Sequence, residues 1–312
     1  LADHEIRVRV IATGVAFADM MMRKGKYPGA PNFPFVPGHE VVGIVECMGR
    51  EVTNFKEGQL VGSFCKYGGY SRFVHVLEKD LVLIPDGVDP YEATAIILNY
   101  LTAYQLLFRT AQVQNGNTIL VHGLAGGVGT ALLQLSKDLD INLYGTASSK
   151  DKQKLISEGA FFIDYRTEDF VERMNSLEPK GVNVVFDGVG GFNWKKSYQT
   201  LKQDGLFVGY GFTYAAEESI KSNEQKFMEE EWTRIMQTDK TSSGHDGRFY
   251  SISKVSKNEP STILEDLDQL FKLLKENKIK PKIAHKIPIE NAATAHQLFE
   301  KGVDGKILLI CQ

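Results

Sequence analysis

The chain has 312 residues, of which 43% are hydrophobic and 24% are charged, and its formal net charge at pH 7 is −3. This length predicts about two domains with packed cores, and the nearly balanced charge excludes the basic surface of a nucleic-acid-binding protein. No apolar run reaches the ~18 residues of a transmembrane helix. We therefore expect neither a nucleic acid partner nor an integral membrane segment.

The cysteines and the start of the chain bear on the compartment. Cys47, Cys65 and Cys311 are scattered along the sequence and form no ligand cluster, which is typical of a reducing compartment. No signal peptide precedes the first strand-like segment, so we expect a cytoplasmic protein. The sequence begins with Leu1 rather than Met, which leaves open whether an N-terminal piece is missing.

Residues 1–97 carry short strand-like runs that are broken by glycine and proline. After the alternating Ile6, Val8 and Val10, such runs occur at 41–45, 59–63, 70–76 and 80–84. Runs this close together predict a compact, mostly antiparallel, barrel-like domain.

Residues 98–253 alternate between strand-like and helix-like patterns, which predicts a doubly wound parallel sheet. A polar, charge-rich segment at 213–247 interrupts this alternation. That segment is either a mobile lid over a cofactor cleft or a surface loop. The expected strands of the sheet are 118–121, 143–146, 161–165, 182–187, 205–209 and 249–252.

Residues 254–312 are predicted to return to the first domain. An amphipathic helix comes first, followed by a short strand around Ile283, a helix at 292–300 and a final strand at 306–310. The apolar face of the first helix is formed by Leu264, Leu267, Leu270, Phe271 and Leu274.

A glycine cluster follows the strand at 118–121 and opens a helix. Gly123, Gly126 and Gly129 allow a tight turn and leave the helix N-terminus free of side chains, so that a phosphate can approach the N–H groups. The G-x-x-G-x-x-G spacing is one residue longer than the usual fingerprint. The surrounding βαβ unit of about 30 residues nevertheless favours a dinucleotide site over a plain structural turn. The expected phosphate contacts are Gly123, Ala125, Gly126, Gly127, Val128 and Gly129.

The end of the next strand predicts which dinucleotide binds. An NAD site places a carboxylate there to accept hydrogen bonds from the ribose, but this chain has Ser148 and Ser149, closely followed by Lys152. Hydroxyls and lysines, with Tyr165 at the end of the following strand, suit the 2′-phosphate of NADPH. The alternative is a solvated charged helix start, and Asp151 among the lysines leaves some use of NAD open.

Five motifs occur in order along nearly the whole chain, at 14–28, 37–43, 99–104, 125–129 and 187–191. Together they resemble the medium-chain dehydrogenase/reductase superfamily in its quinone oxidoreductase-like branch, and 99–104 with 163–169 also resemble the vesicle amine transport protein group. The resemblance implies a GroES-like catalytic domain at 1–97 and 254–312, a Rossmann domain at 98–253, a cleft between them and a homodimer.

The same resemblance raises the question of a catalytic zinc. Ala16 falls at the first ligand position of the zinc enzymes, His39 at the second, and Leu98 or Asn99 at the third. One imidazole cannot hold a catalytic zinc, which needs about three protein ligands. We therefore expect no metal site, a hydrogen-bonded structural role for His39, and pairing of Glu40 with a basic group.

Without a metal, hydride transfer to a quinone or to an α,β-unsaturated carbonyl suits the site, because one hydrogen-bond donor can stabilise the oxygen that gains charge. The resemblance assigns Tyr27 to the active cleft, either as the proton donor or only as its wall. Quinone oxidoreductases commonly have Asn where this chain has Ala16, so a polar contact is lost.

The remaining cofactor contacts come from positions that match the family. Thr102 near the start of a helix, Tyr210 and Gly211 at a strand end, and Phe249 at the start of the last strand are expected to approach the nicotinamide. Asp187 and Gly188 close the fourth strand, where the cleft of a doubly wound sheet lies. Two functions stay open on this basis. One is a zinc-independent, NADPH-dependent quinone or enone oxidoreductase, and the other is a cofactor-binding but mainly non-catalytic protein of the vesicle amine transport type.

Overall fold

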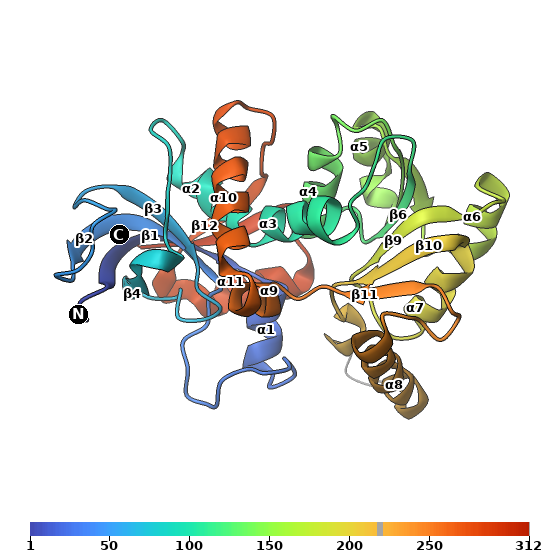
Figure 1. Ribbon diagram of the computed structural model, residues 1–312, viewed down its shortest axis with the longest axis horizontal. Helices are drawn as coiled ribbons and strands as arrows, with labels where there is room; N and C mark the ends of the chain where they lie inside the picture. The colour runs from blue at the N-terminus through green and yellow to red at the C-terminus, as the bar shows by residue number, and fades with distance from the viewer. Residues whose placement is uncertain (217–220, 312) are drawn as a thin grey trace. The chain divides into compact units, whose positions relative to one another are not determined.

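The computed structural model describes residues 1–216 and 221–311. The chain divides into two compact units. The first unit comprises Leu1–Leu101 and Ser253–Gln312, and the second comprises Thr102–Ile252. Each unit contains one β-sheet, which confirms the predicted combination of a mostly β domain with a parallel-sheet α/β domain (Figure 1).

The sheet of the first unit is organised around its long first strand, β1. Among the described residues the strand order is β12-β13-β1-β2-β3-β5, and β4 also pairs with β1. All of these pairs are antiparallel except β12 with β13. The strands are β1 (Glu5–Val15), β2 (Glu40–Met48), β3 (Leu60–Phe64), β4 (Phe73–Leu77), β5 (Val82–Leu83), β12 (Ile283–Pro288) and β13 (Lys306–Ile310).

The helices of the first unit pack their apolar faces onto this sheet and onto each other. α10 (Pro260–Lys275) packs against α2 (Pro90–Ile97) and buries Leu267, Leu270 and Phe271, as its sequence pattern predicted. α3 (Asn99–Tyr104) and α9 (Ile252–Asn258) occupy the two stretches where the chain passes from one unit to the other. The other helical segments are α1 (Phe17–Arg23), α11 (Ala292–Lys301) and the 3₁₀ turns Glu78–Asp80 and Ile289–Asn291.

The sheet of the second unit is parallel throughout, with the order β11-β10-β9-β6-β7-β8. This order confirms the predicted doubly wound sheet. Its direction of winding reverses between β6 and β9, and ligands of such sheets bind beyond the carboxyl ends of the strands at that point. The strands are β6 (Thr118–His122), β7 (Asn142–Ala147), β8 (Phe161–Asp164), β9 (Val182–Asp187), β10 (Leu201–Gly209) and β11 (Asp246–Phe249).

Helices cover both faces of the parallel sheet. Phe170, Trp194 and Met228 belong to one apolar cluster, so their three helices α6, α7 and α8 share a face. Figure 1 shows α4 and α5 on the side opposite α7 and α8. The helical segments are α4 (Gly127–Leu135), α5 (Lys152–Ser157), α6 (Phe170–Leu177), α7 (Phe192–Ser197), α8 (Ser222–Thr238), a π-helical turn at Gln105–Thr110, and 3₁₀ turns at Ser149–Asp151, Tyr198–Thr200 and Thr213–Ala216.

Two predicted elements of the second unit were wrong. The strand expected at 249–252 lies earlier, at Asp246–Phe249, because this edge strand carries charged Asp246 and Arg248 that hide it in the sequence. The segment 213–247, predicted as either a mobile lid or a surface loop, contains the helix α8, which buries Met228 and Ile235 in the core. Its residues 217–220 lie outside the described residues. The surface loop is therefore wrong, and the lid stays a prediction.

Smaller shifts occur in the first unit, where polar turns shorten two expected strands. β4 begins at Phe73 instead of at residue 70, and a 3₁₀ turn at Glu78–Asp80 leaves only Val82–Leu83 as β5.

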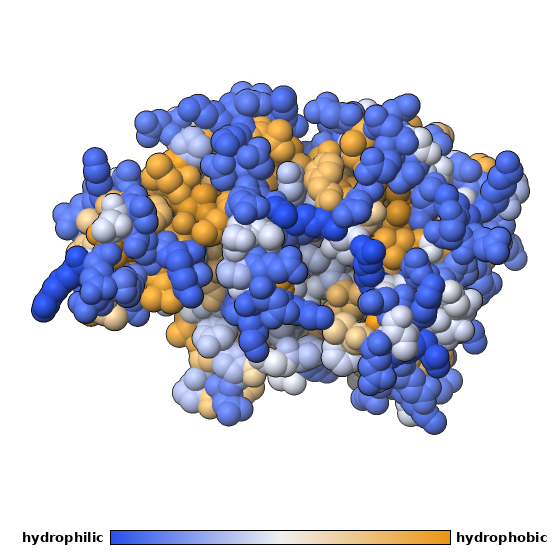
Figure 2. Space-filling model, viewed as in Figure 1, coloured by the Kyte–Doolittle hydropathy of each residue, from blue (hydrophilic) through white to orange (hydrophobic). Residues whose placement is uncertain are grey.

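Hydrophilic side chains cover most of the molecular face drawn in Figure 2. In the part of the chain that is described, no helix combines the length and the apolar character needed to cross a bilayer.

A buried ion pair links β2 to β13 across β1. Lys306 Nζ lies 2.5 Å from Glu40 Oε1, and both side chains are almost completely buried. Gly14 of β1 leaves the necessary space, because a Cβ atom there would lie 1.8 Å from Glu40 Oε1. The expected pairing of Glu40 with a basic group is therefore confirmed.

We predict that Lys306→Met lowers the free energy of unfolding by about 3–5 kcal/mol, because it leaves the Glu40 carboxylate buried without a counter-charge. Burial raises the pKa of Glu40 and Lys306 opposes that rise. In the variant the carboxyl is protonated more readily in the folded state, so the loss should be larger at pH 8 than at pH 5. Urea unfolding measures the effect. The double variant Glu40→Gln/Lys306→Met should recover much of the stability, and an unaltered single variant would contradict the role of the pair.

Candidate functional site

The glycine turn of the second unit joins the end of β6 to the start of α4 by close backbone packing. Gly123 has φ +71°, a conformation that favours glycine. A Cβ atom on Gly129 would lie 2.5 Å from the carbonyl oxygen of Gly123, and one on Gly126 would lie 3.2 Å from the same oxygen. The turn therefore forms a narrow cradle that side chains would fill.

The start of α4 is open to a ligand. Gly126 is the N-cap residue, and no side chain caps the helix among the described residues. Gly126 and Gly127 are exposed, and Ala125 and Val128 are half-buried. Free N–H groups in the first turn of a nine-residue helix, at the positive end of its dipole, form a site suited to a phosphate group.

Asp187 ends β9 at the same edge of the sheet, but its carboxylate is fully buried. Oδ1 accepts hydrogen bonds from the N–H groups of Val189 and Gly190, and Oδ2 accepts from Asn193 Nδ2 and Ser197 Oγ, both at 2.8 Å. The structure thus gives the Asp187 carboxylate a role in shaping the loop, and the contact of Asp187 with the cofactor stays a prediction. Sequence reasoning missed Asn193 and Ser197, because nothing in their spacing signals that they point at Asp187.

The loops after β9 and β10 lie against each other. A Cβ atom on Gly188 would lie 2.8 Å from Tyr210 Cζ, and one on Gly211 would lie 2.8 Å from the carbonyl oxygen of Gly188. The structure therefore brings together Gly188, Tyr210 and Gly211, three of the residues predicted to contact the cofactor. Burial, with a further contribution from Asp187, raises the pKa of Tyr210 and keeps its phenol neutral.

Two predicted cofactor residues have internal surroundings. The ring centroid of Phe249 lies 6.0 Å from that of Trp194 and 6.2 Å from that of Trp232, so Phe249 packs in an aromatic cluster beside α8. Thr102 is almost completely buried within α3.

The ends of β7 and β8 are neighbours, because Ala147 pairs with Asp164 in the parallel register. Ser148 Oγ donates to Asp151 Oδ2 at 2.8 Å, and its hydroxyl is therefore already engaged, whereas Ser149 and Lys152 are exposed.

Across from them, Tyr165 is exposed and the guanidinium carbon of Arg166 lies 5.7 Å from its ring centroid. The Asp164 carboxylate accepts the Arg166 N–H and is thereby held in the turn. Arg166 is a cation of this surface that the sequence prediction did not assign.

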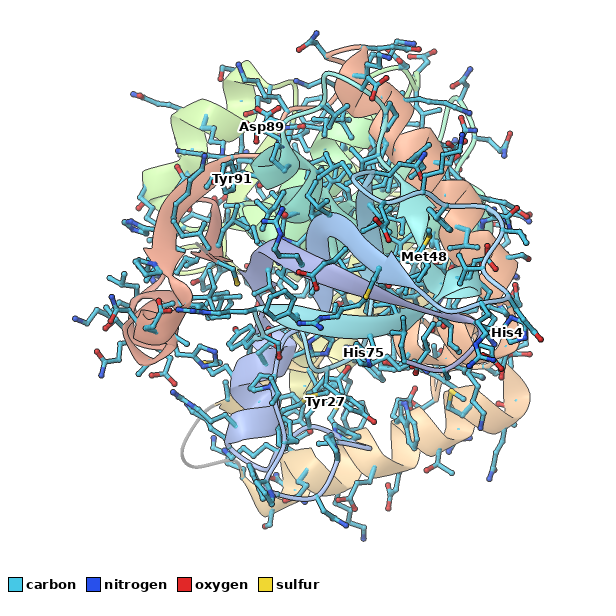
Figure 3. The ribbon with its side chains drawn as sticks, turned by 90° about the vertical axis from the view of Figure 1, so that its left-hand side faces the viewer. His4, Tyr27, Met48, His75, Asp89 and Tyr91 are labelled. Atoms are coloured by element: carbon cyan, nitrogen blue, oxygen red, sulfur yellow. The ribbon has the colours of Figure 1, made fainter. Side chains whose placement is uncertain are left out.

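Tyr27 of the first unit follows α1 and is half-buried (Figure 3). Burial raises the pKa of its phenol, a hydrogen bond with Ser253 opposes the rise, and the Asp19 charge adds to it. The His39 ring lies edge-on to the Tyr27 ring, with 6.1 Å between centroids. A phenol in this environment stays protonated and can donate a proton.

Asp19 holds His39 in place. Its carboxylate accepts hydrogen bonds from the N–H groups of Ala16 and Gly38 and lies 2.7 Å from His39 Nδ1. Burial raises the pKa of Asp19, but the attraction of His39 and these hydrogen bonds outweigh burial and leave the pKa lowered. The predicted hydrogen-bonded role of His39 is confirmed.

The residues at the family's metal position do not fit a catalytic zinc. The side chains of Ala16 and Leu98 offer no ligand atom, which leaves His39 and, if the third position falls one residue later, the amide of Asn99. Among residues 1–216 and 221–311, no group of three or more His, Cys, Asp or Glu side chains is arranged to hold a metal ion. One histidine falls short of the roughly three protein ligands that a catalytic zinc requires.

Comparisons with known proteins agree with this architecture. Residues 2–86 match the alcohol dehydrogenase GroES-like domain family, and residues 159–309 match the zinc-binding dehydrogenase family. The chain is 34% identical over 320 residues to the synaptic vesicle membrane protein VAT-1 homolog of Danio rerio. This alignment covers 99% of the chain and 64% of that relative. It is 41% identical over 211 residues to a quinone oxidoreductase of Pseudomonas aeruginosa, covering 66% of this chain and 65% of the relative.

Among solved structures, the Escherichia coli quinone oxidoreductase in complex with NADPH superposes with a TM-score of 0.86 at 30% identity, covering 99% of this chain and 92% of that one. The chain therefore belongs to the medium-chain dehydrogenase/reductase superfamily, an oxidoreductase family whose Rossmann fold binds nicotinamide dinucleotides. Within it, the chain is related to the VAT-1 homologues and to the quinone oxidoreductases, which confirms the predicted branch. It spans less than two thirds of the length of the zebrafish relative.

Proposed function

We propose that the protein is a zinc-independent oxidoreductase that uses NADPH to reduce a quinone or an α,β-unsaturated carbonyl. The observation that carries this proposal is the uncapped start of α4 next to the glycine turn, a geometry that suits a diphosphate. When bound, the cofactor supplies the hydride. Similarity to a quinone oxidoreductase that was solved with NADPH supports both the cofactor and the acceptor class.

NADPH is favoured over NADH by the side chains around the ends of β7 and β8. Ser149, Lys152 and Arg166 are exposed there, and the neighbouring Asp164 carboxylate is held by the turn. Two cations and a hydroxyl would bind a 2′-phosphate through charge-assisted hydrogen bonds. In this proposal Tyr165 flanks the adenosine, and Thr102, Tyr210 and Gly211 approach the nicotinamide.

Tyr27 is the proposed proton donor. Its raised pKa keeps the phenol protonated at neutral pH, so it can hydrogen-bond to the acceptor oxygen and supply a proton as negative charge develops there. We further propose a cytoplasmic homodimer. The described cysteines Cys47, Cys65 and Cys311 are free, which fits a reducing compartment.

A second candidate is a protein that binds the cofactor but works mainly through binding. Similarity to a synaptic vesicle membrane protein VAT-1 homolog over 99% of the chain favours this alternative. Turnover separates the two candidates. Purified protein mixed with NADPH and a panel of quinones and enones should consume NADPH, followed by loss of its absorbance. Tight NADPH binding without turnover of any acceptor would leave only the second candidate.

Lys152→Glu should weaken NADPH binding by about two orders of magnitude while changing NADH binding much less, because it places a carboxylate beside the 2′-phosphate. Titration of each cofactor against the protein measures both dissociation constants. Lys180→Glu is the matched control, since Lys180 is exposed and precedes the amino end of β9, at the other edge of the sheet. Equal weakening of NADPH and NADH by Lys152→Glu would refute the assignment.

Tyr27→Phe should lower kcat by about 10²-fold, the usual contribution of a positioned general acid. It should leave the dissociation constant of NADPH unchanged, because the phenol acts on the acceptor. Steady-state kinetics with the best acceptor of the panel, together with cofactor titration, tests both expectations. A variant with the parent kcat would make Tyr27 only a wall of the active site.

A further inference from the structure

A buried histidine lies directly beneath the glycine cradle. His122 is the last residue of β6, immediately before Gly123, and only 3% of it is exposed. Its Nδ1 atom lies 3.1 Å from Thr146 Oγ1 of β7, and its Nε2 atom lies 3.0 Å from Ser197 Oγ of α7. Because both ring nitrogens have partners inside the protein, His122 connects three elements of the second unit.

The chain of hydrogen bonds through His122 has a defined direction. Ser197 Oγ donates to Asp187 Oδ2, which is a carboxylate oxygen and only accepts. The Ser197 oxygen can then accept the proton of His122 Nε2, which leaves Nδ1 as an acceptor for the Thr146 hydroxyl.

The last hydrogen bond of this series is made by the glycine turn. Thr146 Oγ1 accepts a hydrogen bond from the Gly123 N–H at 3.3 Å. With the Thr146 proton directed to His122, the lone pairs of Oγ1 are free for Gly123. The series of hydrogen bonds that begins at the Asp187 carboxylate therefore includes the N–H of Gly123, the first residue of the glycine turn.

His122 is neutral in this arrangement. Burial lowers its pKa, and the Asp187 charge partly opposes that shift. The groups around the ring are the Asp187 carboxylate at 4.0 Å, the Phe170 ring with 4.6 Å between centroids, and the hydroxyls of Thr146 and Ser197. A protonated ring would turn Nδ1 into a donor and remove the acceptor for the Thr146 hydroxyl.

We propose that His122 and Thr146 are positioning residues for the dinucleotide site. Through their hydrogen bonds they connect the Asp187 carboxylate to the Gly123 N–H. These bonds hold the glycine turn in the conformation that binds the diphosphate. Neither residue touches the cofactor in this scheme. The inference rests on the proposed binding of a dinucleotide at the start of α4.

The test compares Thr146→Val with Thr146→Ser. Valine keeps the shape but loses the hydroxyl, so the dissociation constant of NADPH should rise about tenfold, as expected for one buried hydrogen bond, whereas serine should keep the parent affinity. The control is Thr200→Val. Thr200 is equally buried and donates to the Ser197 carbonyl, but it lies at the amino end of β10, so its loss should lower the melting temperature without changing NADPH affinity.

A second pair of variants separates the two links of His122 if Thr146→Val folds poorly. Glutamine at 122 (His122→Gln) can still donate to Ser197 but offers no acceptor at the Nδ1 position, and asparagine (His122→Asn) offers that acceptor but no donor to Ser197. His122→Gln should therefore weaken NADPH binding more than His122→Asn.

Amide hydrogen exchange of residues 123–127, measured in the protein without cofactor, tests the ordering of the glycine turn without relying on NADPH binding. Exchange should be faster in Thr146→Val than in the parent, Thr146→Ser and Thr200→Val. Parent-like exchange and parent-like NADPH affinity in Thr146→Val would overturn the inference. If the parent itself binds no NADPH, the proposed function fails, and faster exchange in Thr146→Val would still support the ordering of the turn.

Discussion

The buried carboxylate of Asp187 is the constraint on which the edge of the parallel sheet depends. A charge removed from water is costly unless donors surround it. Here the donors are the N–H groups of Val189 and Gly190 and the side chains of Asn193 and Ser197. To supply them, the loop after β9 must curl back and α7 must begin beside it. The hydrogen bonds to the Asp187 carboxylate thus fix the backbone that follows β9, next to the point where the winding of the sheet reverses.

The first unit uses the same physical solution at another site. Asp19 is also fully buried, and the backbone N–H groups of Ala16 and Gly38 and the ring of His39 satisfy it. These contacts tie the end of β1 to the segment that precedes β2. In the zinc members of the superfamily a metal would organise these positions, as the resemblance implies. In this chain a buried carboxylate that accepts hydrogen bonds from two backbone N–H groups fixes His39.

The sequence predicted the features that depend on backbone geometry and missed those that depend on side-chain partners. The glycines at 123, 126 and 129 indicated the turn, because Gly123 adopts a positive φ and only small residues fit the close contacts at 126 and 129. α8 was missed because three glutamates directly follow Met228, and with the other polar residues of the helix they hide the apolar stripe that continues to Ile235. The internal role of Asp187 was missed for a different reason. A carboxylate at a strand end reads the same in a sequence whether its partner is a ribose or the neighbouring Ser197.

The absence of a fit for zinc also limits the chemistry that Tyr27 can support. Oxidising an alcohol requires a base or a metal to remove the hydroxyl proton, whereas the phenol of Tyr27, whose pKa burial raises, stays protonated at neutral pH and has a proton to donate. An acid favours the direction in which an oxygen gains negative charge and then a proton. Quinones and enones gain that charge on a carbonyl oxygen when hydride adds to a ring carbon or to the β-carbon. Tyr27 as the proposed donor therefore suits acceptors that place the charge on one oxygen.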